Sequence, residues 1–393
     1  MDTSGFLSDD ANNLVPSPIR EAFKLIEKSG IISFAGGMPD PATFPVDEIK
    51  RVISELELSK GLQYGSSPGM IEFREELPKF ANIRGITGLS VDNIMVTTGS
   101  QEALYILSFL LINPGDDVIV EYPTYIATLD AMKLRKPVFH GVPLQEDGID
   151  AVALEKTLKD LKKRDKKAKL IYTIPCSHNP AGVTMSMEKR KRLLELASEY
   201  DTLILEDDAY GLLSFDGKAP NAIKSLDKEE RVIYTSSFSK ILAPGFRIGW
   251  VAADKVIARR IDIMKQSVDM HTSTFNQMIA LEMLKNGAIE RNLPFVRKRY
   301  KEKRDSMVTA IEKYFPKNVT FTRPSGGMFI FSWLEKGINA TKLLPKAIEK
   351  GVAYVPGEDF FFDKKAKNTM RLNFSFPSSE QIEEGIKRLS KIF

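Results

Sequence analysis

The chain has 393 residues, of which 43% are hydrophobic and 27% charged, an ordinary balance for a globular protein of two or three domains. Its 56 basic and 52 acidic residues leave a net charge of +4, which gives no electrostatic reason to expect nucleic acid or a membrane surface as a partner. The single cysteine excludes an intrachain disulfide and favours a reducing compartment, and three scattered histidines argue against a usual zinc site.

The N-terminal stretch, residues 1–13, is acidic and polar and lacks the basic and apolar regions of a signal peptide. No run of about 18 apolar residues, the length that a membrane-spanning helix needs, occurs in the sequence. We therefore expect a cytoplasmic protein without a membrane partner.

A helix is predicted over residues 17–26, because Ser17 would cap it, Pro18 would open it and its apolar residues recur at helical spacing. A short strand at 31–34 then runs into a Gly/Pro-rich loop. There Gly36 would let the backbone approach a ligand closely, or would simply form a turn.

Strand and helix patterns alternate from residue 94 onward, after a predicted helix at 71–80. Strands are predicted at 94–98, 117–121, 137–142, 170–174, 202–206, 231–236 and 248–252, and helices at 102–111, 125–133, 154–163 and 186–200. Several strands are continuous Val/Ile/Leu runs, which is typical of strands covered on both faces. The pattern predicts an α/β domain with a mainly parallel sheet.

The last hundred residues change character, after helices predicted over 255–284 and 293–314. Strands at 319–322, 328–333, 352–355 and 370–376 mix with helices at 343–349 and 379–392, which predicts a smaller α+β unit. We expect an N-terminal arm and helix at 1–30, a large domain at 46–285, and a small domain formed by 31–45 and 286–393.

Polar side chains gather where the predicted strands end, which is where open α/β sheets bind ligands. The residues at these ends are Gly99, Ser100, Gln101, Tyr125, Asn179, Asp207, Tyr210, Ser237, Lys240 and Arg247. The first three open a helix, whose free N–H groups suit an anion. Each residue alone has an ordinary structural explanation, such as a core aromatic, a turn amide or a surface acid. Their shared position favours a site.

Lys240 follows a buried strand and lies in an apolar stretch seven positions before Arg247. These surroundings predict a lowered pKa, which would make Lys240 a candidate Schiff-base nucleophile. A lone lysine is more often a solvated surface residue, so the interpretation depends on the whole stretch Ser236–Trp250.

That stretch, SSFSKILAPGFRIGW, resembles the cofactor-lysine signature of class I/II aminotransferases, which are pyridoxal-phosphate enzymes of fold type I. The resemblance covers nearly the whole chain and implies that Lys240 carries the cofactor and acts as general base. It implies phosphate ligands Ser100, Gln101, Ser237 and Arg247 with the backbone of Gly99, a stacking ring Tyr125, ligands of the cofactor's 3-hydroxyl oxygen Asn179 and Tyr210, and a pyridine-nitrogen partner Asp207.

The resemblance also assigns substrate and subunit contacts. Arg371 would hold the substrate α-carboxylate, with Asn179 and Gly36 nearby. Tyr64 would reach the phosphate of a neighbouring subunit, which implies a homodimer with shared active sites.

The motifs PSPIR at 16–20, FAGGMP at 34–39 and LQY at 62–64 resemble the kynurenine/2-aminoadipate aminotransferase group, which includes LysN-like enzymes. In that group the N-terminal helix covers the substrate, so Arg20 would pair with a distal carboxylate or would remain a solvated helix residue. Candidates for the side-chain pocket are Met38, Leu213, His271 and Phe275.

The expected reaction moves an amino group from an L-amino acid (aromatic, 2-aminoadipate or broad range) to a 2-oxo acid such as 2-oxoglutarate. β-Elimination or decarboxylation on the same fold stays open. The S-x-x-K pattern at 237–240 would also suit an acyl-serine enzyme, but the K-T-G element that such an enzyme needs is absent from the sequence. A transcription regulator would carry a basic DNA-binding domain ahead of this fold, and residues 1–30 are not basic.

Overall fold

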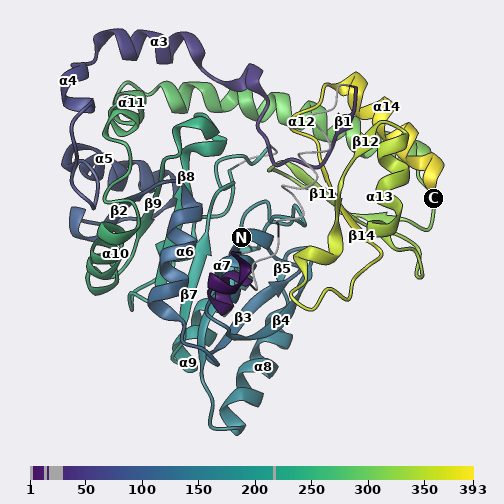
Figure 1. Cartoon of the computed structure of the whole chain (residues 1–393), viewed down its shortest axis with the longest axis horizontal. Helices are drawn as coiled ribbons and strands as arrows, with labels where there is room; N and C mark the ends of the chain where they lie inside the picture. Colours follow the sequence, from purple (N-terminus) through teal and green to yellow (C-terminus); the bar gives the residue numbers. More distant parts are fainter. Residues whose placement is uncertain (1–2, 13–15, 17–29, 216–217) are drawn as a thin grey trace.

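The computed structural model describes residues 3–12, 16, 30–215 and 218–393. Its centre is an eight-stranded sheet (Figure 1). Across the sheet the strands are β2 (Ile94–Thr97), β9 (Gly249–Ala252), β8 (Val232–Ser237), β7 (Leu203–Asp207), β6 (Ala168–Thr173), β3 (Asp117–Tyr122), β4 (Val138–Gln145) and β5 (Gly148–Ile149).

Five neighbouring strands, from β8 to β4, are parallel. β9 is antiparallel to both of its neighbours, β8 and β2. Because two reversals restore the direction, β2 points the same way as the parallel strands. Its carboxyl end therefore lies at the same edge of the sheet as theirs.

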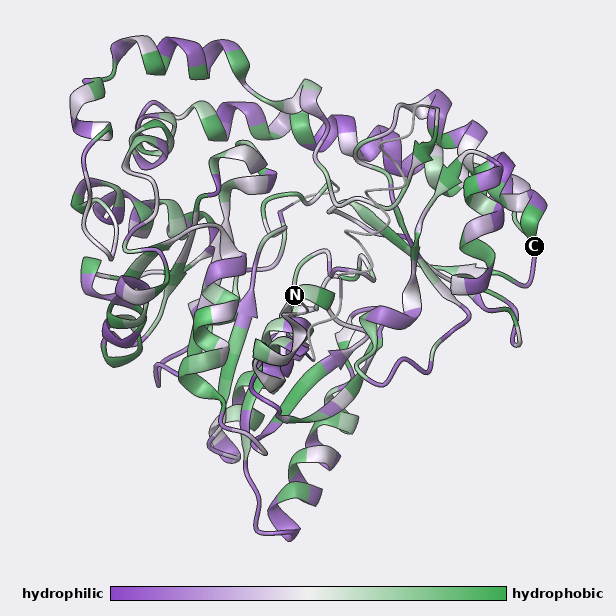
Figure 2. Ribbon diagram, viewed as in Figure 1, coloured by the Kyte–Doolittle hydropathy of each residue, from purple (hydrophilic) through white to green (hydrophobic). Residues whose placement is uncertain are grey.

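Helices cover the sheet, and alternate side chains of each strand face opposite sides. In β3, Ile119 joins one core cluster, which includes Leu154 of α8 (Ala151–Lys163) and Leu193 of α9 (Met187–Glu199), whereas Val118 and Val120 join the main core. Figure 2 shows the strands as largely hydrophobic within this interior. The helices of this part are α3 (Val46–Glu55), α4 (Leu58–Gly61), α5 (Ile71–Ala81), α6 (Ser100–Leu111), α7 (Ile126–Lys133), α8 (Ala151–Lys163), α9 (Met187–Glu199), α10 (Lys255–Val268) and α11 (Thr274–Lys285).

The C-terminal part forms a second unit, drawn in yellow-green in Figure 1. Its sheet has the antiparallel order β10 (Thr320–Phe321), β11 (Phe329–Trp333), β14 (Thr369–Asn373) and β13 (Val355–Pro356), with helices α12 (Ala288–Tyr314), α13 (Ala340–Glu349) and α14 (Ser379–Leu389). The short β1 (Ile32–Ser33) pairs in parallel with β12 (Val352–Ala353), so the chain after residue 30 lies with this unit. The domain boundaries given above stay a prediction.

The strands and helices follow the predicted pattern, with one interruption. The helices predicted over 255–284 are α10 and α11, and Ser273 caps α11. The strand predicted over 352–355 divides into β12 and β13. The helix predicted over 17–26, including Arg20, lies outside the described residues. A four-residue helix, α1 (Asp9–Asn12), precedes it.

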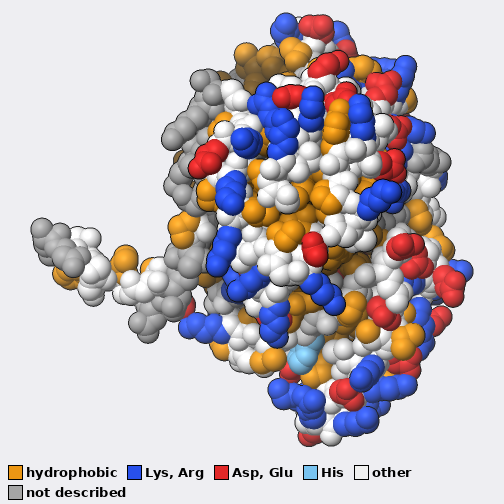
Figure 3. Space-filling model, turned by 90° about the vertical axis from the view of Figure 1, so that its right-hand side faces the viewer, with side chains coloured by type: hydrophobic (Ala, Val, Ile, Leu, Met, Phe, Trp, Pro, Cys, Tyr) orange, Lys and Arg blue, Asp and Glu red, His pale blue; other side chains and the backbone are white. Residues whose placement is uncertain are grey.

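Within the described ranges, none of the helices combines the length and the apolar composition needed to cross a membrane. On the face shown in Figure 3, lysine and arginine side chains lie among aspartate and glutamate side chains rather than in a field of one sign.

Candidate active site

The carboxyl ends of the strands meet at a cleft of about 1010 Å³. Predicted site residues that line it are Ser100, Gln101, Tyr125, Asn179, Asp207, Tyr210, Ser237, Lys240, Arg247 and Arg371. Because Arg371 comes from β14 of the C-terminal unit, the cleft combines the two sheets.

Lys240 ends a single 3-10 turn, Phe238–Lys240, directly after β8. Its Nζ donates a hydrogen bond to the carbonyl of Gly37 at 2.8 Å. Burial lowers the pKa of Lys240 to about 8, and the positive charges of Arg371 and Arg247 act in the same direction. The predicted direction of the shift is confirmed. The contribution of Arg371 was not part of the prediction, which named only Arg247.

Asp207 ends β7 and is buried. Its Oδ2 accepts a hydrogen bond from the Tyr172 hydroxyl at 2.8 Å, and that hydroxyl accepts one from Thr128 at 2.9 Å. Its Oδ1 is buried without a partner. Burial raises the pKa of Asp207 to about 7. A protonated ring nitrogen in the cleft would supply the donor that this oxygen lacks, so the carboxylate fits a pyridinium.

Asn179 links two other predicted ligands. Its Oδ1 accepts a hydrogen bond from Arg371 Nη1 at 2.8 Å, and its side chain also hydrogen-bonds Tyr210. Asn179 lies after β6 and is joined to Pro180 by a cis peptide bond. Burial raises the pKa of Tyr210, so its hydroxyl stays protonated near neutral pH.

Arg371 is almost completely buried, and burial lowers its pKa to about 10. Its Nη2 donates to the carbonyl of Ala35 at 2.7 Å, while its Nε has no partner. The guanidinium carbon lies 4.2 Å from the centre of the Phe329 ring and 5.0 Å from that of Phe360. A buried guanidinium with an unused donor is suited to a carboxylate.

The part of the cleft formed by the start of α6 and Arg247 is suited to a phosphate. Gly99 precedes α6 with a φ of +73°, and a Cβ there would lie 2.4 Å from Arg247 Nη2. Arg247 donates to Ser239 Oγ at 3.3 Å and to the Thr98 carbonyl at 3.5 Å. The start of α6 and the Arg247 guanidinium together provide N–H donors and positive charge. Ser237 lines the cleft beside them.

Some predicted residues lie elsewhere. Gly36 is buried outside the lining, and the neighbouring Gly37 and Met38 line the cleft instead. Tyr64 is 77% exposed and packs edge-on against His271, also outside the lining. Of the four side-chain pocket candidates only Met38 lines the cleft; Leu213, His271 and Phe275 do not.

Tyr172, Thr128 and Phe329 were not predicted from the sequence. Tyr172 and Phe329 occur inside buried strands, where an aromatic residue is ordinary, and no local motif distinguishes them. The described part of the chain contains no group of three or more His, Cys, Asp or Glu side chains placed to hold a metal ion.

The fold, the lysine after a strand, the carboxylate with an unused oxygen and the anion site define a pyridoxal-phosphate-dependent enzyme of fold type I. A family model described as aminotransferase class I and II matches residues 30–389, and the chain belongs to this family.

Similar proteins place the chain more closely within this family. Aromatic-amino-acid aminotransferase 1 of Thermococcus litoralis is 47% identical over 394 residues, which span 100% of this chain and 94% of the relative. The structure of Pyrococcus horikoshii kynurenine aminotransferase superposes with a TM-score of 0.96 at 48% identity, covering 100% of this chain and 97% of that one. LysN, the α-aminoadipate aminotransferase of Thermus thermophilus, gives a TM-score of 0.91 at 35% identity, with coverage of 100% and 98%.

The protein is therefore a pyridoxal-phosphate-dependent transaminase of the LysN-like group, and it transfers amino groups. The family resemblance seen in the sequence, the fold class and the cofactor are confirmed.

Proposed function

We propose that the protein moves the amino group of an L-amino acid, aromatic or 2-aminoadipate or of a broader range, to a 2-oxo acid such as 2-oxoglutarate. The names of the relatives, which act on aromatic amino acids, kynurenine and α-aminoadipate, support this range of donors. The observation that carries the proposal is the buried Arg371, which lines the same cleft as Lys240 and has an unused Nε donor.

Pyridoxal phosphate, when bound, supplies an electron-withdrawing ring that stabilises negative charge at the substrate Cα. Its phosphate would be held by Arg247, by the hydroxyls of Ser100 and Ser237, by Gln101 and by the N–H groups after Gly99. Its ring would stack on Tyr125, its nitrogen would face Asp207, and its 3-hydroxyl oxygen would face Asn179 and Tyr210.

Arg371 has the form to bind the substrate carboxylate through two parallel N–H bonds, which fixes the orientation of the Cα–H bond. Lys240, whose lowered pKa leaves a substantial neutral fraction near pH 8, takes the proton from Cα. Because Arg371 retains the carboxylate while Lys240 moves the proton, the arrangement favours transamination over decarboxylation.

The assembly and the location are part of the proposal. We propose a cytoplasmic homodimer in which the N-terminal residues 1–30 cover the substrate and Tyr64 serves the neighbouring subunit. The 77% exposure of Tyr64 and the 80% exposure of nearby Leu62 support a partner surface here, because such large side chains are usually covered.

The test is the visible spectrum of the purified holoenzyme before and after single amino acids are added without an oxo acid. Loss of the cofactor band with release of one equivalent of 2-oxo acid establishes the transamination half-reaction, and the ranking of amino acids identifies the donor. Release of ammonia would instead indicate β-elimination, and release of carbon dioxide would indicate decarboxylation. A protein that shows no band with added pyridoxal phosphate would contradict the role of Lys240.

Arg20 provides a test of donor preference. If it pairs with a distal carboxylate, Arg20→Ala should raise KM for 2-aminoadipate and glutamate about tenfold, through the loss of one charge-assisted hydrogen bond, and leave KM for leucine and phenylalanine nearly unchanged. Steady-state kinetics with the four donors measures the difference. Equal changes for all four would contradict the pairing.

A further inference from the structure

The segment Phe34–Asp40, here called the 34–40 segment, contacts two of the three cationic side chains that line the cleft, Arg371 and Lys240, through its backbone. The carbonyl of Ala35 accepts a hydrogen bond from Arg371, and the carbonyl of Gly37 accepts one from Lys240. Gly37 and Met38 also line the cleft. The position of this segment therefore influences where both cations lie and how wide the cleft is on that side.

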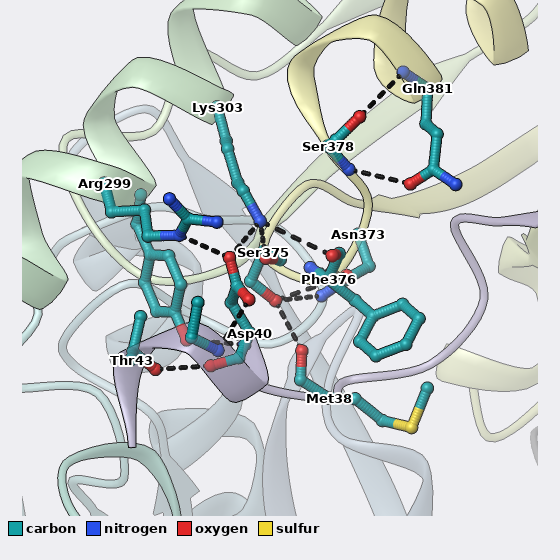
Figure 4. Close-up of polar contacts among 12 residues, drawn as sticks. Met38, Asp40, Thr43, Arg299, Lys303, Asn373, Ser375, Phe376, Ser378 and Gln381 are labelled. Carbon is teal, nitrogen blue, oxygen red and sulfur yellow. Dashed lines mark hydrogen bonds and ion pairs between the residues drawn. The ribbon is translucent and has the colours of Figure 1, made fainter. Parts of the chain in front are cut away.

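The segment ends in an ionic cluster outside the cleft lining, in which Asp40 and Lys303 are buried and the Arg299 side chain is 38% exposed (Figure 4). Asp40, 5% exposed, accepts hydrogen bonds on Oδ2 from Lys303 Nζ and from Arg299 Nε, each at 2.5 Å. Both partners lie on α12. The backbone of Asp40 is held as well, since its N–H donates to the Tyr300 hydroxyl and its carbonyl accepts from Thr43.

Lys303 connects this cluster to the strand that carries Arg371. Besides Asp40, its Nζ donates to the carbonyls of Ser375 at 2.7 Å and Phe376 at 3.4 Å, just after β14. The Ser375 hydroxyl in turn donates to the carbonyl of Met38 at 2.7 Å. One ammonium group thus links the 34–40 segment and the end of β14, as Figure 4 shows.

We propose that Asp40 and Lys303 are positioning residues for the amino acid substrate, holding the Gly37 and Met38 backbone at a fixed distance from Arg371. This inference rests on the proposed function. Well-packed apolar residues could fill the same space without loss of stability, so burial of the ions does not by itself explain the cluster. An ammonium group that donates to three converging acceptors fixes the position of each acceptor, whereas apolar groups in contact can slide past one another.

Lys303→Met tests the proposal, because it removes the shared donor while keeping the apolar stem. We expect KM for the amino acid to rise about tenfold, equivalent to ~1.4 kcal/mol, with kcat within about twofold and cofactor affinity unchanged. The double variant Asp40→Asn with Lys303→Met should cost little more than Lys303→Met alone, since the two residues act as one unit.

Lys224→Met is the matched control. The Lys224–Asp227 ion pair is equally buried, with side-chain exposures of 8% and 0% against 5% and 8% for Lys303 and Asp40, and neither partner lines the cleft. The control should lower the melting temperature by a comparable amount and leave KM unchanged. A similar rise of KM in both variants would overturn the proposal.

Hydrogen exchange supplies a readout that needs no turnover. Amides of residues 34–43 should exchange faster in Lys303→Met than in wild type or Lys224→Met. In the same variant, Lys303→Met, the affinity for the amino acid should be lower, as measured by titrating the absorbance of the holoenzyme. Hydrogen exchange and amino acid binding do not depend on which reaction the bound amino acid undergoes. They therefore test the positioning role even if the protein turns out not to catalyse transamination.

Ser375→Ala keeps the test decisive if Lys303→Met does not fold. It removes only the hydroxyl contacts with Met38 and Asn373 and leaves the ion pair intact. We expect a rise in KM of about threefold, the net value of one neutral hydrogen bond, with faster exchange of the Met38 amide region. Unchanged exchange and unchanged KM would overturn the proposal.

Discussion

At the scale of single residues, Asp207 carries an unfavourable burial energy that a bound ligand can relieve. Its Oδ1 is buried without a donor, and the Tyr172 hydroxyl satisfies only the other oxygen. Burial therefore holds the pKa of the carboxyl near 7 in the cofactor-free protein. A donor brought by the cofactor relieves this cost, so binding and the protonation state of the ring are coupled through one oxygen.

Asp207→Asn should stabilise the cofactor-free protein in a pH-dependent way. The pKa of Asp207 is raised from 3.8 to about 7, so from about pH 4 to 7 the folded protein keeps a proton that the unfolded chain has lost. Stability therefore falls as pH rises through this window. We expect the variant to exceed wild type by a few kcal/mol at pH 8, and by much less at pH 5, because asparagine does not titrate.

Thermal unfolding of the cofactor-free proteins at the two pH values measures this difference. Loading with pyridoxal phosphate should reverse the order at pH 8, since the wild-type carboxylate then gains its partner. A stability difference that does not change with pH would show that the carboxyl is not held protonated by burial.

At the scale of elements, the turn from β2 into α6 fits against Arg247 so closely that it excludes a side chain. Gly99 has a φ of +73°, and its Cβ would meet the Arg247 guanidinium at 2.4 Å. On the other side, Gly249 of β9 lies against the backbone of Gly99 and Ser100, where a Cβ would be only 2.5 Å away. The helix start is thus held between a strand and a cation, which fixes the N–H groups that face the cleft.

Gly99→Ala should weaken pyridoxal phosphate binding about tenfold to a hundredfold, because the new methyl group displaces Arg247 from the anion site. Gly115→Ala is the control, since Gly115 has a φ of +86° but no atom within 4 Å of its Cβ position. Both variants carry a strained backbone, but only Gly99 lies at the anion site and meets Arg247. Equal cofactor dissociation constants, measured by absorbance titration, would contradict this account.

The elements of the site were predictable where a local pattern determines them. Val/Ile/Leu runs mark the buried strands, and the polar residues after each run mark the edge where Asp207 and Lys240 meet. Contacts between distant segments were not predictable. The Gly37 carbonyl that binds Lys240 is a backbone group without a sequence signal, and Tyr172 is one aromatic residue among many in a core. Such partners depend on the packing of whole elements.

At the scale of the whole molecule, the surface around Tyr64 lies apart from the cleft of its own chain. Tyr64 follows α4, is widely exposed and contacts His271, whose Nε2 accepts a hydrogen bond from the Gly65 N–H. If Tyr64 binds the cofactor phosphate, as proposed above, the site that it serves would belong to another chain. Twofold symmetry would then place each Tyr64 at the partner's cleft.

Mixing two defective variants tests the shared site. Lys240→Ala lacks the lysine, and Tyr64→Ala should bind pyridoxal phosphate weakly at limiting cofactor. In a hybrid dimer one site carries both defects and the other carries neither, so subunit exchange should restore about a quarter of wild-type activity at equal mixing. The separate variants, incubated alone through the same exchange procedure, are the control. No recovery on mixing would contradict sharing.

The antiparallel strand β9, which lies between β8 and β2, has a consequence for how the protein folds. β9 pairs residues 249–252 with residues 94–97, so the strand pairing that supports Gly99 joins segments distant in sequence. Ordering such a long loop is slow, because its entropy is lost before the pairing is gained. The proposed phosphate site includes this completed edge, so we expect pyridoxal phosphate to slow unfolding in stopped-flow measurements and to leave the refolding rate unchanged. The cofactor would thus stabilise the folded chain kinetically, by lowering its unfolding rate.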